Sequence, residues 1–275
     1  MPTLHGARVA LLEARMSEEA ASLVRQMGGV PYCVPAVREI PRLEQARPFI
    51  DALSRGDFSL AVFLTGASVS ALLREAEQLG RLEATLGALR MTTIACRGPK
   101  PSAVMRHHNV PVHIAPREPY TTKELLEALA AVDVHGKAVA LAHYGEPNEL
   151  LAGTLRARGA RLEELCLYEW VMPEDLEALE TLVDELIDRH VDAVAFTNQI
   201  QCRHLFQVAD ALGRSEALAD ALNSHTVVAA VGPVCAAALN ALGITPDVIP
   251  AHPKMGPMIA ALAEYLELTE GSTEE

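Results

Sequence analysis

The chain of 275 residues is 50% hydrophobic and 21% charged, so it can build buried cores and is not intrinsically disordered. Its length allows two domains of ordinary size. The formal net charge of −13 excludes a general nucleic-acid binder, because no basic excess is available to displace counterions from phosphates.

Short apolar runs alternate with amphipathic helical patterns in the first part of the chain. The predicted strands are, in chain order, 7–14, 30–37, 59–66, 91–98, 111–116, 137–145 and 162–171. The helices between them are 17–29, 46–56, 67–80, 99–110, 121–132 and 147–160. Ser17 is the expected N-cap of the first helix, and Thr121 with Glu124 has the capping-box spacing. Short strands that are apolar on both faces and separated by helices predict an α/β fold with parallel sheets.

An internal repeat predicts that the second part of the chain has the architecture of the first. The segments that begin at Phe63 and Phe196 both run strand, turn, long helix, short helix, strand, Gly-Pro, helix, strand. The residues that the repeat pairs are Thr65 and Thr197, Gly80 and Gly213, Gly98 and Gly232, and Pro99 and Pro233.

The repeat leaves the N-terminal strand–helix–strand unassigned, and the simplest completion joins it to the second copy. One domain then comprises residues 1–37 and 172–275, and the other, residues 42–166, is inserted into it. The chain would cross between the two domains twice, near 38–41 and near 167–171.

The cysteines and the apolar runs indicate the compartment. The N-terminal apolar run is too short for a signal peptide, and no run approaches the roughly 18 apolar residues of a membrane helix. We therefore expect a cytoplasmic protein without a membrane partner, and a monomer, because aromatic residues make up only 4% and suggest no dimer surface. The cysteines expected to be reduced core residues are Cys33, Cys96, Cys166, Cys202 and Cys235.

Standard catalytic motifs are missing from the sequence. It contains no G-x-G-x-x-G, no Walker loop, no C-x-x-C, no H-E-x-x-H and no G-x-S-x-G. His107 and His108 lie on a charged helix with no third ligand spaced to join them, so we expect no metal site there.

Four turns at the ends of predicted strands favour an anion site instead. At Gly98–Pro99 and Gly232–Pro233 a strand ends and a helix begins, so backbone amides point outward at the carboxyl edge of the sheet. Exposed helix starts attract anions by roughly 0.3–1 kcal/mol each. The turns at 65–68 and 197–199 offer the same geometry with a hydroxyl or an amide. Each alone is equally an ordinary strand–helix turn, but four turns paired by the repeat favour one shared site.

Side chains near these turns complete the candidate site. Arg15 follows the first strand, and Tyr168 lies in the second crossover, where its phenol can face the site or pack as a half-buried strand residue. The candidate binding residues are Arg15, Thr65, Gly66, Ala67, Ser68, Arg97, Gly98, Pro99, Lys100, Tyr144, Gly145, Thr197, Asn198, Gln199, Gly232, Pro233 and Val234.

A set of segments, taken in chain order, resembles uroporphyrinogen III synthase over nearly the whole chain. The order is a strand ending near Arg15, then FLTGAS, ACRGPKPSA, YTTKELLEAL, AHYGEP, LYEWV, DAVAFTNQIQ and AVGPVCAAALNALGI. Members of that family more often carry Ser where Asn198 stands, and a hydroxyl residue near Val234 or Cys235.

The resemblance implies two flavodoxin-like or Rossmann-like α/β domains joined by a two-stranded connector. It implies conversion of hydroxymethylbilane to uroporphyrinogen III, with loss of water, inversion of the terminal ring, and no cofactor or metal. This linear tetrapyrrole carries eight carboxylates, which suits a cleft lined by helix starts and basic residues. Tyr168 matches the family tyrosine proposed to assist departure of hydroxide, which makes it the candidate general acid. Two thin crossovers also suggest closure of the domains around the ligand.

A non-catalytic protein is the alternative interpretation. Two similar α/β lobes with double crossovers also describe periplasmic-type ligand binders, so a cytoplasmic binding or regulatory protein for a tetrapyrrole or other small polyanion has the same plan. A dinucleotide enzyme is disfavoured, because the glycine fingerprint is missing.

Overall fold

The structure is a computed structural model, and it describes residues 2–14, 16–143 and 145–271. The chain forms two compact units, each with its own parallel sheet. One unit comprises Met1–Arg38 with Val171–Glu275, and the other comprises Glu39–Trp170. A two-stranded sheet of β3 (Arg38–Pro41) and β8 (Tyr168–Val171) lies where the chain passes from one unit to the other.

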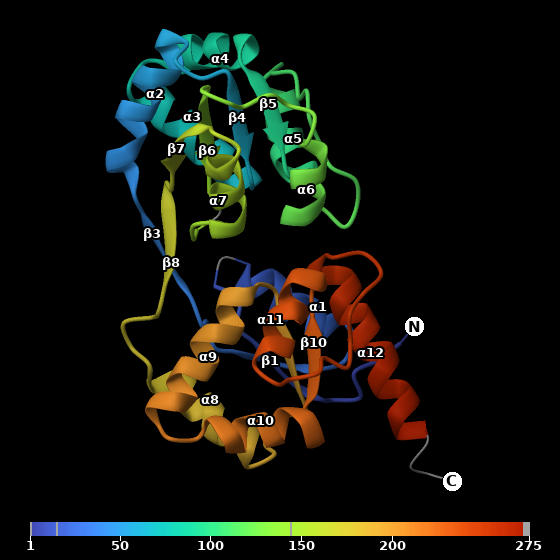
Figure 1. Cartoon of the computed structure of the whole chain (residues 1–275). Helices are drawn as coiled ribbons and strands as arrows, with labels where there is room; N and C mark the ends of the chain where they lie inside the picture. Colours follow the sequence, from blue (N-terminus) through green and yellow to red (C-terminus); the bar gives the residue numbers. More distant parts are fainter. Residues whose placement is uncertain (1, 15, 144, 272–275) are drawn as a thin grey trace. The chain divides into compact units, whose positions relative to one another are not determined.

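The discontinuous unit contains a parallel sheet in the order β10-β9-β1-β2 (Figure 1). A bridge between Ala229 and Val248 adds one more position beyond β10. Numbered within the unit, the order is 2-1-3-4-5, which is the order of flavodoxin-like sheets. The strands are β1 (Arg8–Leu11), β2 (Val30–Cys33), β9 (Ala193–Phe196) and β10 (Val227–Ala230).

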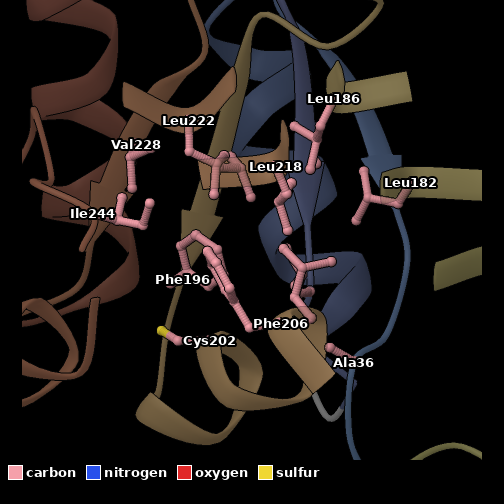
Figure 2. Packing of buried hydrophobic residues seen from close by; sticks show 14 of the residues in the cluster. Ala36, Leu182, Leu186, Phe196, Cys202, Phe206, Leu218, Leu222, Val228 and Ile244 are labelled. Atoms are coloured by element: carbon pink, nitrogen blue, oxygen red, sulfur yellow. The ribbon is translucent and has the colours of Figure 1, made fainter. Parts of the chain in front are cut away.

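Alternation along these strands divides the buried side chains between two faces of the sheet. Ala10 and Phe196 point to one face, which α8, α9, α10 and α11 cover, whereas Val9 and Leu11 point to the other face, which α1 and α12 cover. Figure 2 shows Phe196 and leucines of α8 and α10 in the first of these cores. The helices are α1 (Ser17–Gln26), α8 (Glu177–Ile187), α9 (Gln199–Ala211), α10 (Ser215–Ser224), α11 (Pro233–Ala241) and α12 (Met255–Gly271).

The inserted unit has a parallel sheet in the order β5-β4-β6-β7 (Figure 1). Ala61 and Phe63 face α2 to α5, while Leu60 and Val62 face α6 and α7. The strands are β4 (Leu60–Phe63), β5 (Thr93–Cys96), β6 (Ala138–Ala142) and β7 (Arg161–Leu165). The helices are α2 (Ala46–Arg55), α3 (Gly66–Gln78), α4 (Leu82–Met91), α5 (Pro99–His107), α6 (Thr122–Ala128) and α7 (Glu149–Ala157), with a 3-10 turn at Leu43–Gln45.

The fold class predicted from the sequence is confirmed, and so is the internal repeat. Equivalent hydrogen bonds recur in the two units: the Arg97 N–H donates to the Phe63 carbonyl (3.0 Å), and the Val231 N–H donates to the Phe196 carbonyl (2.9 Å). The predicted capping box of Thr121 and Glu124 is present at the start of α6. In the described part of the chain, no helix is both long and apolar enough to cross a membrane.

Four local predictions were wrong. Ser17 is the first residue of α1 and not its N-cap, which is Met16 without a side-chain hydrogen bond. The predicted strand 162–171 is two strands, β7 and β8, and the predicted strand 111–116 is reduced to one bridge between Ala95 and Ile114. The cysteines are not all core residues: Cys33 is exposed, because it ends the edge strand β2, and Cys166 is half-buried, whereas Cys96, Cys202 and Cys235 are buried as expected.

Replacing Phe196 by alanine tests how much the core of α8 to α11 stabilises the discontinuous unit. The side chain is fully buried, so Phe196→Ala should lower the free energy of unfolding by about 3–5 kcal/mol. Met91→Ala is the control, because Met91 is 89% exposed and its loss should change stability by less than about 0.5 kcal/mol. Denaturant melts of the two variants would contradict the assignment of this core if they coincided.

Candidate functional site

Each sheet has a switch point, which is the gap between two neighbouring strands from which successive strands are added in opposite directions. In the inserted unit the switch point lies between β4 and β6. The chain goes from β4 to β5 on one side of β4, and then returns to form β6 on the other side of β4. In the discontinuous unit it lies between β1 and β9 for the same reason. Ligands of open α/β sheets bind outside the carboxyl ends of the strands at such points, so these two places define the candidate site regions.

In the inserted unit, the turn after β4 is held by Thr65. The Thr65 hydroxyl oxygen accepts the Ser68 N–H (3.1 Å) and so caps α3, and the Ser68 hydroxyl donates back to the Thr65 carbonyl (2.9 Å). Gly66 packs against the backbone of Lys100, since a Cβ there would lie 3.2 Å from the Lys100 carbonyl oxygen. The 65–68 turn and the Gly98–Pro99 turn are therefore neighbours, as the hypothesis of a shared site requires.

The two Gly-Pro helix starts have no side-chain cap. A Cβ at Gly232 would lie 2.8 Å from Pro253, and one at Gly98 would lie 3.5 Å from Tyr120, so a loop crosses closely over each glycine. Pro99 and Pro101 have no amide hydrogen, so Lys100 supplies the only N–H among the first three residues of α5. Lys100, Pro99, Pro233 and Val234 are exposed, and Arg97 is half-buried.

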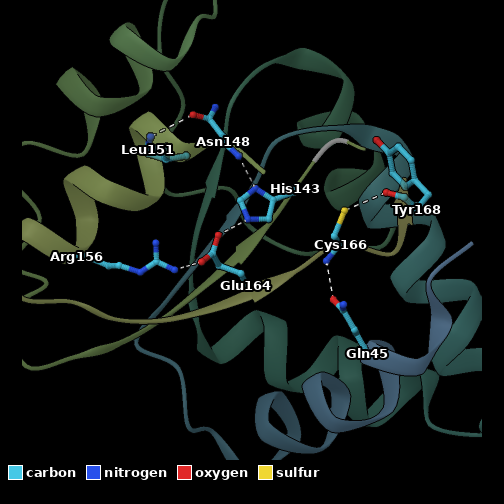
Figure 3. A network of polar contacts seen from close by, with 8 residues as sticks. All are labelled: Gln45, His143, Asn148, Leu151, Arg156, Glu164, Cys166 and Tyr168. Atoms are coloured by element: carbon cyan, nitrogen blue, oxygen red, sulfur yellow. Dashed lines mark hydrogen bonds and ion pairs between the residues drawn. The ribbon is translucent and has the colours of Figure 1, made fainter. Parts of the chain in front are cut away.

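Tyr168 lies beside the Thr65 turn. Its hydroxyl oxygen is 3.0 Å from that of Thr65, and only 4% of the residue is exposed. The Cys166 thiol donates to the Tyr168 carbonyl (3.0 Å), and the Cys166 N–H donates to Gln45 (3.1 Å; Figure 3). The structure thus brings the candidate general acid to the end of β4, as a buried side chain whose hydroxyl already contacts a candidate binding residue.

The backbone of Gly145 lies so close to the Trp170 ring that only glycine fits there. Its φ is +100°, and a Cβ there would lie 2.6 Å from the Trp170 ring. The Trp170 N–H donates to the Gly145 carbonyl (3.1 Å), which ties the loop after β6 to β8. The candidates Arg15 and Tyr144 lie outside the described residues.

A buried histidine ties the end of β6 to the start of α7, and the sequence analysis missed it. His143 is 2% exposed, and its Nδ1 accepts the Asn148 N–H (3.1 Å), so the ring proton is on Nε2 and is donated to Glu164 (2.6 Å; Figure 3). Arg156 pairs with the same carboxylate. Asn148 caps α7 by accepting the Leu151 N–H (3.1 Å). The one available signal was an asparagine just before a helical pattern.

In the discontinuous unit, Asn198 is the equivalent of Thr65, because each is the N-cap of the long helix. The predicted pairing of Thr65 with Thr197 was therefore wrong by one residue. The Asn198 side chain accepts the N–H groups of Ile200 and Gln201 (3.0 Å each), and the Gln201 carbonyl oxygen accepts the Thr197 N–H (2.8 Å). The expectation of outward-pointing amides fails at this turn, because its own side chains use them.

Glu13 is a further polar residue at this turn that the sequence analysis missed. Thr197 donates its hydroxyl proton to the Glu13 carboxylate, and the Gln201 amide donates to the Thr197 hydroxyl oxygen (2.9 Å). Pairing of Leu11 with Ala195 was the missing information, since continuing that parallel register places Glu13 beside Thr197. Gln199 and Asn198 are half-buried in the same turn.

The buried thiols are unsuited to act as nucleophiles. Burial raises the pKa of the Cys96 thiol to about 11, and the hydrogen bond with Cys235 together with burial raises the pKa of Cys202. Thiolates are the reactive form, so both groups stay protonated and unreactive near neutral pH. Among residues 2–14, 16–143 and 145–271, no three His, Cys, Asp or Glu side chains are grouped to hold a metal ion.

Comparison with known proteins gives the family. The family model of uroporphyrinogen-III synthase HemD matches residues 18–260. The chain belongs to the uroporphyrinogen III synthase family. Members of this family are lyases of porphyrin and haem biosynthesis, and the resemblance read from the sequence is confirmed.

Several relatives match this chain over nearly its whole length. It is 33% identical over 268 residues to the uncharacterised protein YjjA of Bacillus subtilis strain 168, covering 97% of this chain and 98% of that one. It is 32% identical to a putative uroporphyrinogen-III synthase of Methanothermobacter thermautotrophicus, covering 90% and 93%. A mutant uroporphyrinogen III synthase of the extremely thermophilic bacterium Thermus thermophilus has a similar structure, with a TM-score of 0.79, 28% identity, and coverage of 95% and 99%.

Alanine at Gly145 tests the contact with Trp170 in this synthase family member. We expect Gly145→Ala to lower the free energy of unfolding by about 2–4 kcal/mol. The cost of a left-handed φ for alanine and the cost of overpacking against the Trp170 ring add to each other. Gly80→Ala is the matched control: Gly80 has φ of +68° and open space around a Cβ, so only the backbone cost of about 1–2 kcal/mol applies. Equal destabilisation of the two variants in thermal melts would show that the Trp170 contact is unimportant.

Proposed function

We propose that the chain is a uroporphyrinogen III synthase, a lyase that converts hydroxymethylbilane to uroporphyrinogen III with loss of water and inversion of the terminal ring. The observation that carries the proposal is the contact of Tyr168 with Thr65 at the switch point of the inserted unit, in a chain of this family. Among the described candidate residues, no side chain is suited to metal or thiolate chemistry. The hydroxyl groups of Thr65 and Tyr168, however, lie within hydrogen-bond distance of each other.

Substrate binding in this proposal uses the carboxyl edge of each sheet. The uncapped start of α5 lies next to exposed Lys100 and half-buried Arg97 in the chain, which suits carboxylates, and α11 likewise begins without a side-chain cap. The turn of Asn198 is expected to contribute shape and its side chains, because its amides are satisfied internally. The proposed contacts are Arg15, Thr65, Gly66, Ala67, Ser68, Arg97, Gly98, Pro99, Lys100, Tyr144, Gly145, Thr197, Asn198, Gln199, Gly232, Pro233 and Val234.

Tyr168 is the proposed general acid for the departing hydroxide. The Thr65 hydroxyl has one proton, which it can donate to Ser68 Oγ (3.1 Å) or to the phenol oxygen (3.0 Å). When Thr65 donates to the phenol oxygen, it stabilises the phenolate that remains after proton transfer. The Ser68–Thr65 pair therefore supports transfer of the phenol proton to the leaving oxygen, a role worth typically 10²–10⁴ in rate.

Most of the remaining task is positioning. The linear substrate also closes without an enzyme, to the isomer whose terminal ring is not inverted, so the protein must hold one folded geometry. Rigid turns at the ends of β4, β9 and β10, each locked by capping or close packing, suit that task. A binding protein for the same ligand would use the same turns, and turnover distinguishes the two functions.

The test is to supply purified protein with freshly generated hydroxymethylbilane and to separate the oxidised isomers by chromatography. Tyr168→Phe should lower kcat by about 10²-fold, because the general acid is lost, while KM changes little. Tyr265→Phe is the control tyrosine on α12, where only an Asp247 contact at 3.5 Å is lost, and it should keep wild-type kcat. Formation of only the uninverted isomer at high wild-type concentration would refute the synthase proposal, and saturable binding without turnover would favour the binding protein.

A further inference from the structure

The short link between β7 and β8 sets where Tyr168 begins. β7 ends at Leu165 and β8 begins at Tyr168, so residues 166 and 167 alone join the two strands. The Arg42 N–H donates to the Leu167 carbonyl (2.8 Å), and Leu165 and Leu167 are both buried in the core of α2 to α5. The leucines are therefore fixed by the backbone and by the core, whereas Cys166 between them depends on contacts with side chains.

The amide of Cys166 has no strand to bond to. The Arg161 N–H donates to the Lys137 carbonyl (2.8 Å) on the side of β6, and amides alternate in direction along a strand, so the Cys166 N–H points to the other side of β7. β7 is the edge strand of its sheet, so no neighbouring strand lies there. The side-chain carbonyl of Gln45 accepts the Cys166 N–H instead (3.1 Å), from the 3-10 turn before α2. Gln45 thus replaces the acceptor that a neighbouring strand would supply.

The thiol of Cys166 makes the second contact of this link. It donates to the Tyr168 carbonyl (3.0 Å), as Figure 3 shows together with the contact to Gln45. Burial and, after it, the negative charge of Glu169 raise the pKa of the Cys166 thiol above its ordinary value, so the thiol keeps the proton that it donates. Two hydrogen bonds therefore run from exposed Gln45 through Cys166 to the first residue of β8.

The position of the phenol depends on how this backbone is held. The phenol oxygen is the atom of Tyr168 farthest from the main chain, so a rotation of the backbone displaces it more than any other atom of the residue. It lies 3.0 Å from the Thr65 hydroxyl oxygen, the upper limit for a good bond between two hydroxyl groups. Misplacement of a reacting group by about 1 Å can cost about 10²-fold in rate.

We propose that Gln45 and Cys166 are positioning residues for proton transfer from Tyr168; this rests on the proposed synthase function. Neither residue contacts the substrate or gives up a proton in the reaction. Gln45 holds the amide of the link, the Cys166 thiol holds the Tyr168 carbonyl, and the phenol stays at hydrogen-bond distance from Thr65. Loss of either contact lowers the share of molecules whose phenol is correctly placed, so kcat falls while substrate binding is unchanged.

Gln45→Ala removes the outer contact and leaves the core intact, because Gln45 is exposed. We expect kcat to fall about fivefold and KM to stay within about twofold of wild type, because positioning of one group is lost and binding is not. Gln45→Glu keeps an oxygen at the same reach and should return kcat to within about twofold of wild type. Gln78→Ala is the matched control, since Gln78 is an exposed glutamine at the far end of α3, and it should keep wild-type kcat.

Cys166→Ala and Cys166→Ser test the inner contact. Alanine has no donor and should lower kcat about fivefold, whereas serine keeps a donor and should stay within about twofold of wild type. Trp170 is the only tryptophan of the chain, and its ring centroid lies 6.0 Å from that of Tyr168, so its fluorescence reports on β8. Its emission should change in Cys166→Ala and Gln45→Ala and match wild type in Cys166→Ser.

The same substitution in a Tyr168→Phe background shows whether Gln45 acts through the phenol. Without the phenol its position has no effect, so Gln45→Ala should change kcat of Tyr168→Phe by less than about twofold. A fivefold loss in both backgrounds would reveal a general structural role and overturn the proposal. Wild-type kcat in both Gln45→Ala and Cys166→Ala would also overturn it, and so would wild-type kcat in Tyr168→Phe. Wild-type protein that forms no inverted isomer would overturn the synthase function itself.

Discussion

Parallel pairing of β4 with β6, and of β1 with β9, decides which side chains can act together in this chain. The register of each pair sets which residue after one strand lies beside which residue after the other, and a shift of one residue would turn these side chains to the opposite face. The Leu64 N–H donates to the Ala142 carbonyl (3.2 Å) for this reason, and Glu13 lies beside Thr197. The buried faces on both sides of each sheet fix the register, so the cores and the candidate site depend on the same pairing.

Helix capping and anion binding compete for the same amides, and the four turns resolve that competition differently. A polar side chain at the cap satisfies the first amides of a helix itself, as Asn198 does for Ile200 and Gln201. Glycine at the cap has no side chain to do so, and α5 and α11 begin in that way. The Gly-Pro turns are therefore the stronger candidates for carboxylates, whereas the Asn198 turn offers a rigid wall.

The sequence was sufficient for the α/β class, the parallel sheets and the repeat, because apolar runs and turn residues are local signals. It was insufficient for the boundary between β7 and β8, since residues 162–171 form one continuous apolar-rich pattern. Contacts that depend on strand register and on side-chain rotamers could not be predicted from the sequence either. Neither the bond between Tyr168 and Thr65 nor the buried tautomer of His143 has any signature in residue order. The pairing of Thr65 with Thr197 failed because both units carry threonine near the turn, and only the cap position identifies Asn198 as the true equivalent.

The repeat gives the two units the same frame and leaves different chemistry at its two switch points. In the inserted unit the switch point holds a phenol and two hydroxyls, which can pass a proton. In the discontinuous unit it holds the carboxylate of Glu13, which accepts the Thr197 hydroxyl proton beside the buried amide of Gln201. A duplicated fold therefore repeats the backbone of the two turns, while the side chains that gather at each turn come from different elements, Tyr168 from β8 and Glu13 from just after β1.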